Sequence, residues 1–381
     1  MFATKKDVKS ERRKGWKWED YKSFFIEKTA PYVFLAPFLF SLIVFFGYAA
    51  VRTFYYSLTN YNLFDKPEFI GLANYINIFK QSTFLLALRN TIVFSFVVTV
   101  VQTIGALLLA LLMNQKIKGI RFFRTIYYMP SVTASVVITL IFLWLFQRQG
   151  LINYLFTFVK QYVNYFIVFL GAFLFLYFIV YLWLRGKEEG EISYGDSRVL
   201  VVSFTGALLL AIILAYFKIL PIAENSPVDI IWINTRELLF GFIPRPLFAI
   251  MCLNIWTTIP TMSILYLAGL QDIPAELYEA AEVDGATSFQ KFLYITVPQL
   301  SRVTFLVMTL GFIGTLQMFD QVAVVGNSAP LESIITLAYY VYTNVFSSSG
   351  IANVGLAAAA AFILGFLTLI VVFFQKKFYK D

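Results

Sequence analysis

Long apolar runs alternate with short polar segments along the whole chain. A helix that crosses a bilayer needs about 20 mostly apolar residues. Eight stretches reach that length: 31–58, 88–113, 122–146, 162–184, 199–220, 246–269, 299–321 and 354–374. Their runs are continuous, whereas the strands of a membrane barrel alternate between apolar and polar positions. The pattern therefore predicts an all-α, polytopic membrane protein with about eight transmembrane helices.

The composition agrees with a lipid environment and excludes several kinds of chemistry. Hydrophobic residues make up 59% of the chain and charged residues only 14%, against about 25% charged residues in soluble domains. Histidine is absent and Cys252 is the single cysteine, which excludes imidazole catalysis, internal disulfides and zinc sites built on paired cysteines. A phosphate-cradling GxxxxGK[ST] loop is also missing. We expect no enzyme, no bound metal and no nucleotide site in this chain.

The net charge of +8 comes from basic residues in short segments next to the apolar runs. Nine lie between residues 5 and 28, four between 116 and 124, and three between 376 and 380. These segments do not alternate basic residues with polar residues that could contact bases in a nucleic-acid groove. No nucleic-acid partner is therefore expected. With eight spans these segments share one side, and the positive-inside rule places them and both termini in the cytoplasm. The sequence WKWEDYKSFF (16–25) is either an interfacial helix or a disordered basic tail.

One polar, glycine-containing stretch separates the sixth and seventh apolar runs: EAAEVDGATSFQKFLYITVP, residues 279–298. Upstream of it, Asp272 is expected to cap a helix whose first turn holds Pro274. Gly285 fits the position that ends that helix. A second short helix is expected to start at Thr287 or Ser288. The two helices, residues 275–298, form what we call the elbow, on the cytoplasmic surface.

One face of the first elbow helix suits contact with another protein. Leu277, Ala280, Ala281 and Asp284 share this face at helical spacing. Its small side chains let the backbone of a partner approach closely. The stretch contains no nucleophile–base pair and no metal-ligand set. We therefore interpret the elbow as a docking element.

The same stretch resembles the EAA signature of ABC importer permeases. The matching positions are Glu279, Ala280, Ala281, Gly285, Ile295 and Pro298, and the sequence departs at Val297, where leucine is usual. IPAELYEAAEVDGATSFQKFLYITVPQL and GIRFFRTIYYMPSV (119–132) are similar to carbohydrate permeases of the maltose and glycerol-phosphate type. The resemblance covers residues 31–153 and 229–381.

The resemblance implies a set of partners and roles. Glu279, Ala280, Ala281, Asp284 and Gly285 would couple the permease to separate ATPase subunits, which hold ATP and Mg. A second, different permease and an extracytoplasmic solute-binding protein that delivers a sugar would complete the importer. Transport would proceed by alternating access.

The resemblance also implies a division of the chain. Residues 1–30 form a basic cytoplasmic segment, 31–153 the first part of the permease core, and 229–381 the second part with the elbow. The sequence of residues 154–228 departs from the family pattern, and we interpret it as an insertion of two spans. The insertion either packs against lipid or serves a partner or regulatory role.

Polar residues in the sixth and seventh runs are candidates for the substrate pathway, because transport sites lie near the bilayer midplane. They are Asn254, Trp256, Thr257, Thr258, Thr315, Gln317 and Asp320. Ordinary packing between helices explains the same residue types, and Asp320 also fits an interfacial structural role. The alternative function, an ion-coupled secondary transporter or channel, predicts paired ionisable residues within the spans, which the sequence does not clearly show.

Overall fold

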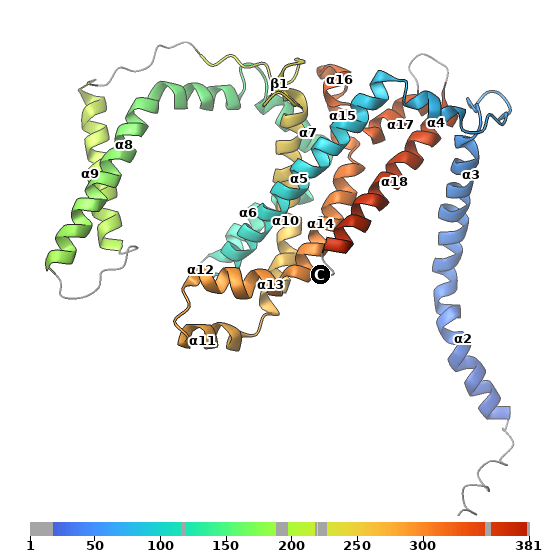
Figure 1. Cartoon of the computed structure of the whole chain (residues 1–381), viewed down its shortest axis with the longest axis horizontal. Coiled ribbons are helices and arrows are strands. Elements are labelled where there is room, and N and C mark those ends of the chain that lie inside the picture. Colours follow the sequence, from blue (N-terminus) through green and yellow to red (C-terminus); the bar gives the residue numbers. More distant parts are fainter. Residues whose placement is uncertain are drawn as a thin grey trace, which may run out of the picture. The chain divides into compact units, whose positions relative to one another are not determined.

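The structure is a computed structural model that describes residues 18–115, 119–187, 197–217, 219, 227–346 and 352–378 (Figure 1). Helices dominate the described residues. A two-stranded antiparallel ribbon joins β1 (Leu238–Leu239) to β2 (Ile243–Pro244). The all-α prediction is confirmed. The basic residues before 18, at 116 and 118, and at 218 and 380 lie outside the described residues.

Seven stretches of the described chain are long and apolar enough to cross a membrane: Lys28–Ser57, Ser82–Asn114, Leu151–Gly186, Ser197–Tyr216, Arg245–Gln271, Ser301–Ser328 and Val354–Lys377. The first combines α2 (Trp18–Ser41), η2 (Leu42–Gly47) and α3 (Tyr48–Ser57). Its helix already begins at Trp18, so the part of the 16–25 stretch that is described is helical and continuous with the first span. The others are built on α5 (Ser82–Asn114), α8 (Leu151–Lys187), α9 (Ser197–Tyr216), α10 (Arg245–Gln271), α14 (Ser301–Leu316) with α15 (Asp320–Val325), and α18 (Val354–Phe378).

The predicted third span, residues 122–146, is not one straight helix. It consists of α6 (Ile120–Val132) and α7 (Ser135–Leu145), bent by 97° at their junction. Thr133 and Ala134 leave the helical conformation, with ψ of 142° and 131°. Pro130, which cannot donate a backbone hydrogen bond, lies just before the break. The pair is therefore either a broken span or a re-entrant loop.

Helix packing decides between these two arrangements. At one end of α5, Phe94 and Val98 share a buried cluster with Leu247 and Ile250 of α10. At the other end, the later residues of both helices form a second cluster that includes Ala106, Ala110, Tyr266 and Leu270. α5 and α10 thus run parallel, which requires an odd number of crossings between them. With α8 and α9 as two crossings, the bent pair supplies the third, and the described residues contain eight crossings.

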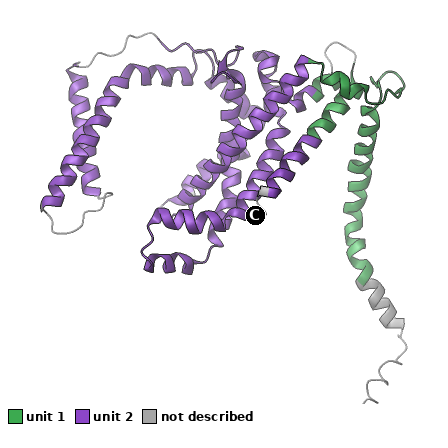
Figure 2. Cartoon of the chain, viewed as in Figure 1, with its two compact units in different colours: residues 1–81, 341–365 green, residues 82–340, 366–381 purple. Residues whose placement is uncertain are grey.

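The chain divides into two compact units (Figure 2). Residues 1–81 and 341–365 form unit 1, and residues 82–340 and 366–381 form unit 2. In unit 1, Asn74 of α4 (Ala73–Ile78) donates hydrogen bonds to the carbonyls of Ser57 (2.9 Å) and Thr59 (2.7 Å). Gly355 N donates to Tyr61 O at 3.0 Å. These contacts fix the end of the first span against the start of α18.

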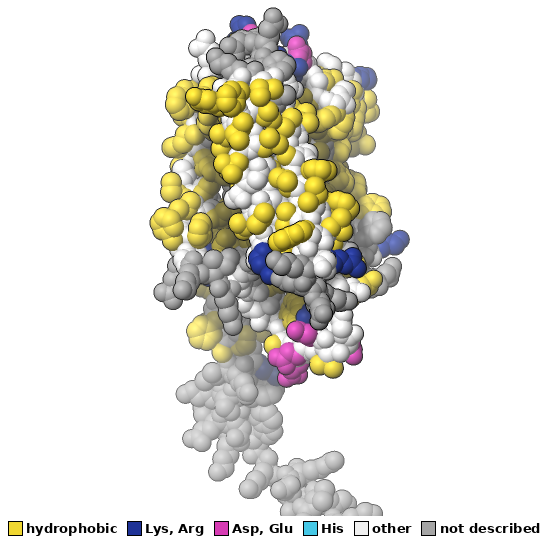
Figure 3. Space-filling view, turned by 90° about the vertical axis from the view of Figure 1, so that its left-hand side faces the viewer, with side chains coloured by type: hydrophobic (Ala, Val, Ile, Leu, Met, Phe, Trp, Pro, Cys, Tyr) yellow, Lys and Arg dark blue, Asp and Glu magenta, His cyan; other side chains and the backbone are white. Residues whose placement is uncertain are grey.

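In unit 2, α14 packs antiparallel to α5. Ser95 of α5 contacts Thr315 near the end of α14, whereas Ala106 shares a cluster with Leu300 at its beginning. The elbow, residues 275–298, comprises α11 (Ala275–Val283), α12 (Ser288–Lys291), η3 (Phe292–Thr296) and the start of α13 (Val297–Gln299). The short helices η4 (Gly326–Ser328), α16 (Leu331–Ile334) and α17 (Leu337–Val345) precede α18. Figure 3 shows hydrophobic side chains over the middle of one face and most charged ones towards its ends.

Candidate functional site

The first elbow helix ends at a glycine in the left-handed conformation, as predicted. Gly285 has φ of +77°. Its N–H donates to Glu282 O at 3.0 Å, and Ala286 N donates to Ala281 O at 2.9 Å. These two bonds make a Schellman motif, which satisfies carbonyls that the end of a helix leaves open. The predicted cap at the other end is wrong: Asp272 is the C-cap of α10, and Pro274 occupies the N-cap of α11. Only residues 272–274 separate the two helices: Asp272 ends α10, and Pro274 is the residue directly before α11.

The second elbow helix starts where the sequence predicts. Thr287 caps α12 in a capping box: its hydroxyl accepts from Gln290 N, and its own N–H donates to Gln290 Oε1 at 2.7 Å. Lys291 then pairs with Glu282 across the elbow at 2.9 Å. The hydrogen bond and charge of Lys291 lower the pKa of Glu282. Caps and ion pair fix the two helices against each other, so the elbow has a defined shape.

The elbow exposes both its motif residues and large apolar side chains. Glu279, Ala280, Asp284 and Gly285 are exposed, and Ala281 is half-buried. Val283, Phe289 and Tyr294 are exposed by 89%, 70% and 73%. Apolar side chains clustered on a polar loop mark an interaction site. The elbow therefore has the character of a docking surface.

The elbow lies on the same side of unit 2 as the end of α18. Gln375 Nε2 of α18 donates to Phe305 O, one turn into α14, at 2.9 Å. Lys376 and Lys377 follow in the last turn of α18. The ends of α5 and α10 also meet at this side, in the cluster around Tyr266 and Leu270. Arg124, whose side chain donates to Met113 O near the end of α5, and the basic end of α18 thus lie on the same side of unit 2 as the elbow.

A buried polar layer connects the long helices in the middle of unit 2. Thr315 of α14 lies 2.9 Å from Ser95 and 3.1 Å from Thr99 of α5, oxygen to oxygen. Thr258 Oγ1 of α10 donates to Gln102 Oε1 of α5 at 2.7 Å. α14 approaches closely here, because a Cβ on Gly311 would lie 2.4 Å from Gln102 Nε2. Neutral hydroxyl and amide groups thus line the contact between three spans.

Asn254 and Trp256 lie on α10 next to this layer. Asn254 Nδ2 donates to Gln321 Oε1 at 3.2 Å, while its buried Oδ1 has no hydrogen-bond partner. A buried acceptor without a partner is costly, so the hydrogen-bonding capacity of this oxygen is unmet in this conformation. Trp256 is exposed and lies 5.4 Å from the ring of Phe142. Thr257 instead donates to carbonyls of its own helix.

Gln317 and Asp320 flank the break between α14 and α15. Both are exposed, and the Asp320 carboxylate accepts a hydrogen bond from Ser135, the first residue of α7. Asp320 therefore connects the break in the third span with the break in the seventh. The structure gathers Thr258 and Thr315 around α5. Asn254 instead contacts Gln321 of α15, and Gln317 and Asp320 lie at the α14–α15 break.

Sequence reasoning missed the residues that α5 contributes. Ser95, Thr99 and Gln102 are fully buried partners of the predicted candidates. With Thr91 they follow a helical spacing, which places them on one face of an otherwise apolar run. That polar stripe was the available signal. Among the described residues, no group of three or more Cys, Asp or Glu side chains is arranged to hold a metal ion.

Comparison with known proteins places the chain among membrane transport proteins. The family described as "Binding-protein-dependent transport system inner membrane component" matches residues 102–381. The chain belongs to this family and is the permease subunit of an ABC importer. The permease prediction is confirmed, and the family decides against an enzyme and against the ion-coupled transporter or channel.

Curated relatives match over most of their length. The arabinooligosaccharides transport system permease protein AraP of Bacillus subtilis is 28% identical, over 94% of this chain and 91% of its own. The trehalose/maltose permease MalF of Thermococcus litoralis is 28% identical over 82% of each chain. The sn-glycerol-3-phosphate permease UgpA of Escherichia coli is 23% identical, over 94% and 96%. A crystal structure of a bacterial alginate ABC transporter with a pentasaccharide-bound periplasmic protein shares the fold, with a TM-score of 0.62, 18% identity, and coverage of 93% and 95%.

Proposed function

We propose that this permease imports a carbohydrate without a net charge. The observation that carries the proposal is the buried layer between α5, α10 and α14, together with the neighbouring Asn254–Gln321 bond between α10 and α15, because all these polar groups are hydroxyls and amides. Such groups exchange hydrogen bonds with sugar hydroxyls, whereas a phosphate favours Arg or Lys. Asp320, an acceptor, also suits a hydroxyl donor. The names of AraP and MalF point to saccharides as well.

Energy for transport comes from separate ATPase subunits that dock on the elbow. Its exposed motif residues, Glu279 to Gly285, and its apolar side chains support this role. With eight spans and with Arg124, Lys376 and Lys377 on the side of the elbow, the positive-inside rule supports a cytoplasmic position for the elbow and both termini. A second permease and an extracytoplasmic solute-binding protein complete the importer. The permease then alternates between inward- and outward-facing states.

The proposal is tested by mild affinity purification of the chain from its native membrane, followed by mass spectrometry and uptake assays. We expect an ATPase subunit and a different permease to co-purify, and neutral oligosaccharide uptake to persist when the proton gradient is collapsed at constant ATP. Competition with unlabelled saccharides and with glycerol phosphate identifies the substrate class. Recovery without an ATPase, or inhibition by glycerol phosphate alone, would contradict the proposal.

Asn254 is the pathway residue with the clearest expected effect. Replacing it by leucine removes the unpaired Oδ1 and the bond to Gln321. Loss of one neutral hydrogen bond to substrate costs about 1 kcal/mol, so we expect the KM for uptake to rise by about 3- to 10-fold. Thr205→Val on α9, whose hydroxyl bonds to its own helix, is the control. An unchanged KM with a lower thermal stability would assign Asn254 to packing.

A further inference from the structure

The helix α8 is too long to lie wholly within the hydrocarbon of a bilayer. Its apolar stretch, Leu151–Gly186, has 36 residues, which corresponds to about 54 Å of helix. The hydrocarbon core is only about 30 Å thick. Figure 1 shows that the first turns of α8 lie across the direction of the rest of the helix. We call residues 151–165 the arm.

The arm has a polar stripe and an apolar face. The polar residues Asn153, Thr157, Gln161 and Asn164 recur at intervals of three and four, so they share one side of the helix. Phe158, Tyr162 and Tyr165 fall on the other side. A helix with this pattern lies in a membrane interface, with its apolar face towards the acyl chains.

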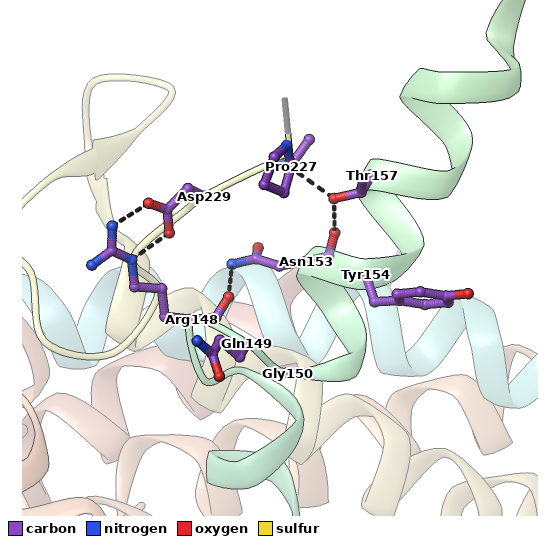
Figure 4. Close-up of a pocket in the computed structure, with 9 residues that line it drawn as sticks. Arg148, Gln149, Gly150, Asn153, Tyr154, Thr157, Pro227 and Asp229 are labelled. Atoms are coloured by element: carbon purple, nitrogen blue, oxygen red, sulfur yellow. Dashed lines mark hydrogen bonds and ion pairs between the residues drawn. The ribbon is translucent and has the colours of Figure 1, made fainter. Parts of the chain in front are cut away.

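Contacts at the start of the arm show which side faces water. The side chain of Asn153 donates to Arg148 O at 2.9 Å (Figure 4). It also donates to Ile230 O at 2.8 Å and accepts from Trp232 Nε1 at 2.8 Å. Arg148 and Asp229 form an ion pair whose side chains are 67% and 45% exposed. This pairing lowers the pKa of Asp229. An exposed ion pair needs water, so the polar stripe looks away from the hydrocarbon.

An apolar cavity opens on the opposite face. Its volume is about 630 Å³, and carbon atoms form nearly all of its lining. The lining residues come from the arm and the turn after it, and from the end of α9: Phe158, Val159, Tyr162, Tyr165, Phe166, Leu208, Ala211, Ile212 and Ala215. Water requires two to four polar partners in such a site. An apolar occupant is therefore favoured.

The cavity exists because α8 and α9 separate towards the arm. At the other end of the hairpin, Ser203 and Ala207 are fully buried, and a Cβ on Gly206 would lie 2.9 Å from Leu176 Cδ1. The helices are in tight contact there. Near Ala211 and Ala215 the arm has turned aside, and the small alanine side chains leave the space unfilled.

We propose that this cavity binds the acyl chain of a membrane phospholipid, in the leaflet on the side opposite the elbow. The cavity lies beneath an interfacial helix, at the depth where acyl chains begin, and its carbon lining excludes a sugar or an ion. The two helices of one hairpin border it, which favours a thin, flexible chain over a helix about 10 Å in diameter. The bound lipid would fill the gap under the arm and fix its bend. This site is independent of the substrate that the permease carries.

The test uses the intact transporter in nanodiscs that contain a phosphatidylglycerol with a photoactivatable diazirine in its acyl chain. After irradiation, peptide mass spectrometry locates the labelled residues. We expect labelling at 158–166 and 208–215 to exceed that at Leu174 and Phe178, which are exposed on the spanning part of α8, by about 5-fold or more. Ala211→Trp fills the cavity and should remove this excess, whereas Leu209→Trp, on the exposed face of α9, should retain it.

Each outcome decides the proposal. Excess labelling in the wild type that is lost in A211W supports an acyl-chain site. Uniform labelling along the hairpin overturns it, as does protection of the cavity together with a protein crosslink to another permease chain. If A211W does not accumulate, the wild-type protein still tests the proposal, through its labelling at 158–166 and 208–215 compared with that at Leu174 and Phe178. A negative result on the acyl-chain site does not contradict the proposed sugar import, because uptake is measured in a separate experiment.

Discussion

Replacing Gly285 by valine is expected, under the proposed docking of an ATPase subunit on the elbow, to weaken that docking and to abolish most uptake. At φ of +77°, Gly285 occupies a conformation that L-residues reach at a cost of about 1–2 kcal/mol, and more for a β-branched side chain. A Cβ at this position would meet no atom within 4 Å. The penalty is therefore conformational, and it acts on the Schellman turn that fixes the end of α11.

A cost of this size lowers the population of the docking-competent elbow by about 5- to 30-fold. Uptake and the recovery of the ATPase subunit on affinity purification should fall together. Gly285→Asn is the matched control, because asparagine tolerates the left-handed conformation, and it should retain most of both. Equal loss in both variants would show that contact with the partner requires the absence of a side chain. Undiminished docking and uptake in the valine variant would contradict a coupling role for the elbow.

The elbow was predictable because its signals are local. Gly285 in the left-handed conformation and the cap at Thr287 depend on residues within four positions of each other. The prediction that Asp272 is an N-cap was wrong, because α10 continues through Gln271 and Asp272 is the C-cap of that helix. The residues around Asp272 do not show where α10 ends. A residue type that favours the N-cap identifies the start of a helix only if the preceding helix ends before that residue.

The break in the third span and the contacts of the candidate pathway residues were harder to predict from the sequence. The run 122–146 is apolar enough to predict one continuous span, although Pro130 and the small polar residues Ser131, Thr133 and Ser135 lie at the extended Thr133–Ala134 junction. Asp320 contacts Ser135, 185 positions away in sequence. Contacts of this range follow from the packing of the spans, which periodicity in one sequence does not specify. In the sequence, the residues that α5 adds to the buried polar layer form only a stripe of polar positions, from Thr91 to Gln102.

A second large effect is expected at Gly355, near the start of α18. Here the restriction is steric: a Cβ would lie 2.1 Å from Thr59 O and 3.0 Å from Asn74 Nδ2. The obstacle at Thr59 is backbone, which cannot rotate away as a side chain does. Asn74 holds that same carbonyl at 2.7 Å and is itself buried. Gly355→Ala must therefore displace the turn that ends the first span or break its clamp.

Overpacking costs about 1–3 kcal/mol, and a buried amide that loses its partner costs about 1–3 kcal/mol more. We expect Gly355→Ala to lower the thermal midpoint of the purified transporter by several degrees and to reduce its abundance in the membrane. Gly365→Ala on the same helix, where a Cβ would meet no atom within 4 Å, should leave both unchanged. In a double-mutant cycle with Asn74→Ala, the two losses should be less than additive, because both variants open the same clamp. Additive losses would place the effect of Gly355 outside the Thr59 turn, and an unchanged midpoint would contradict the close approach of α18 to the end of the first span.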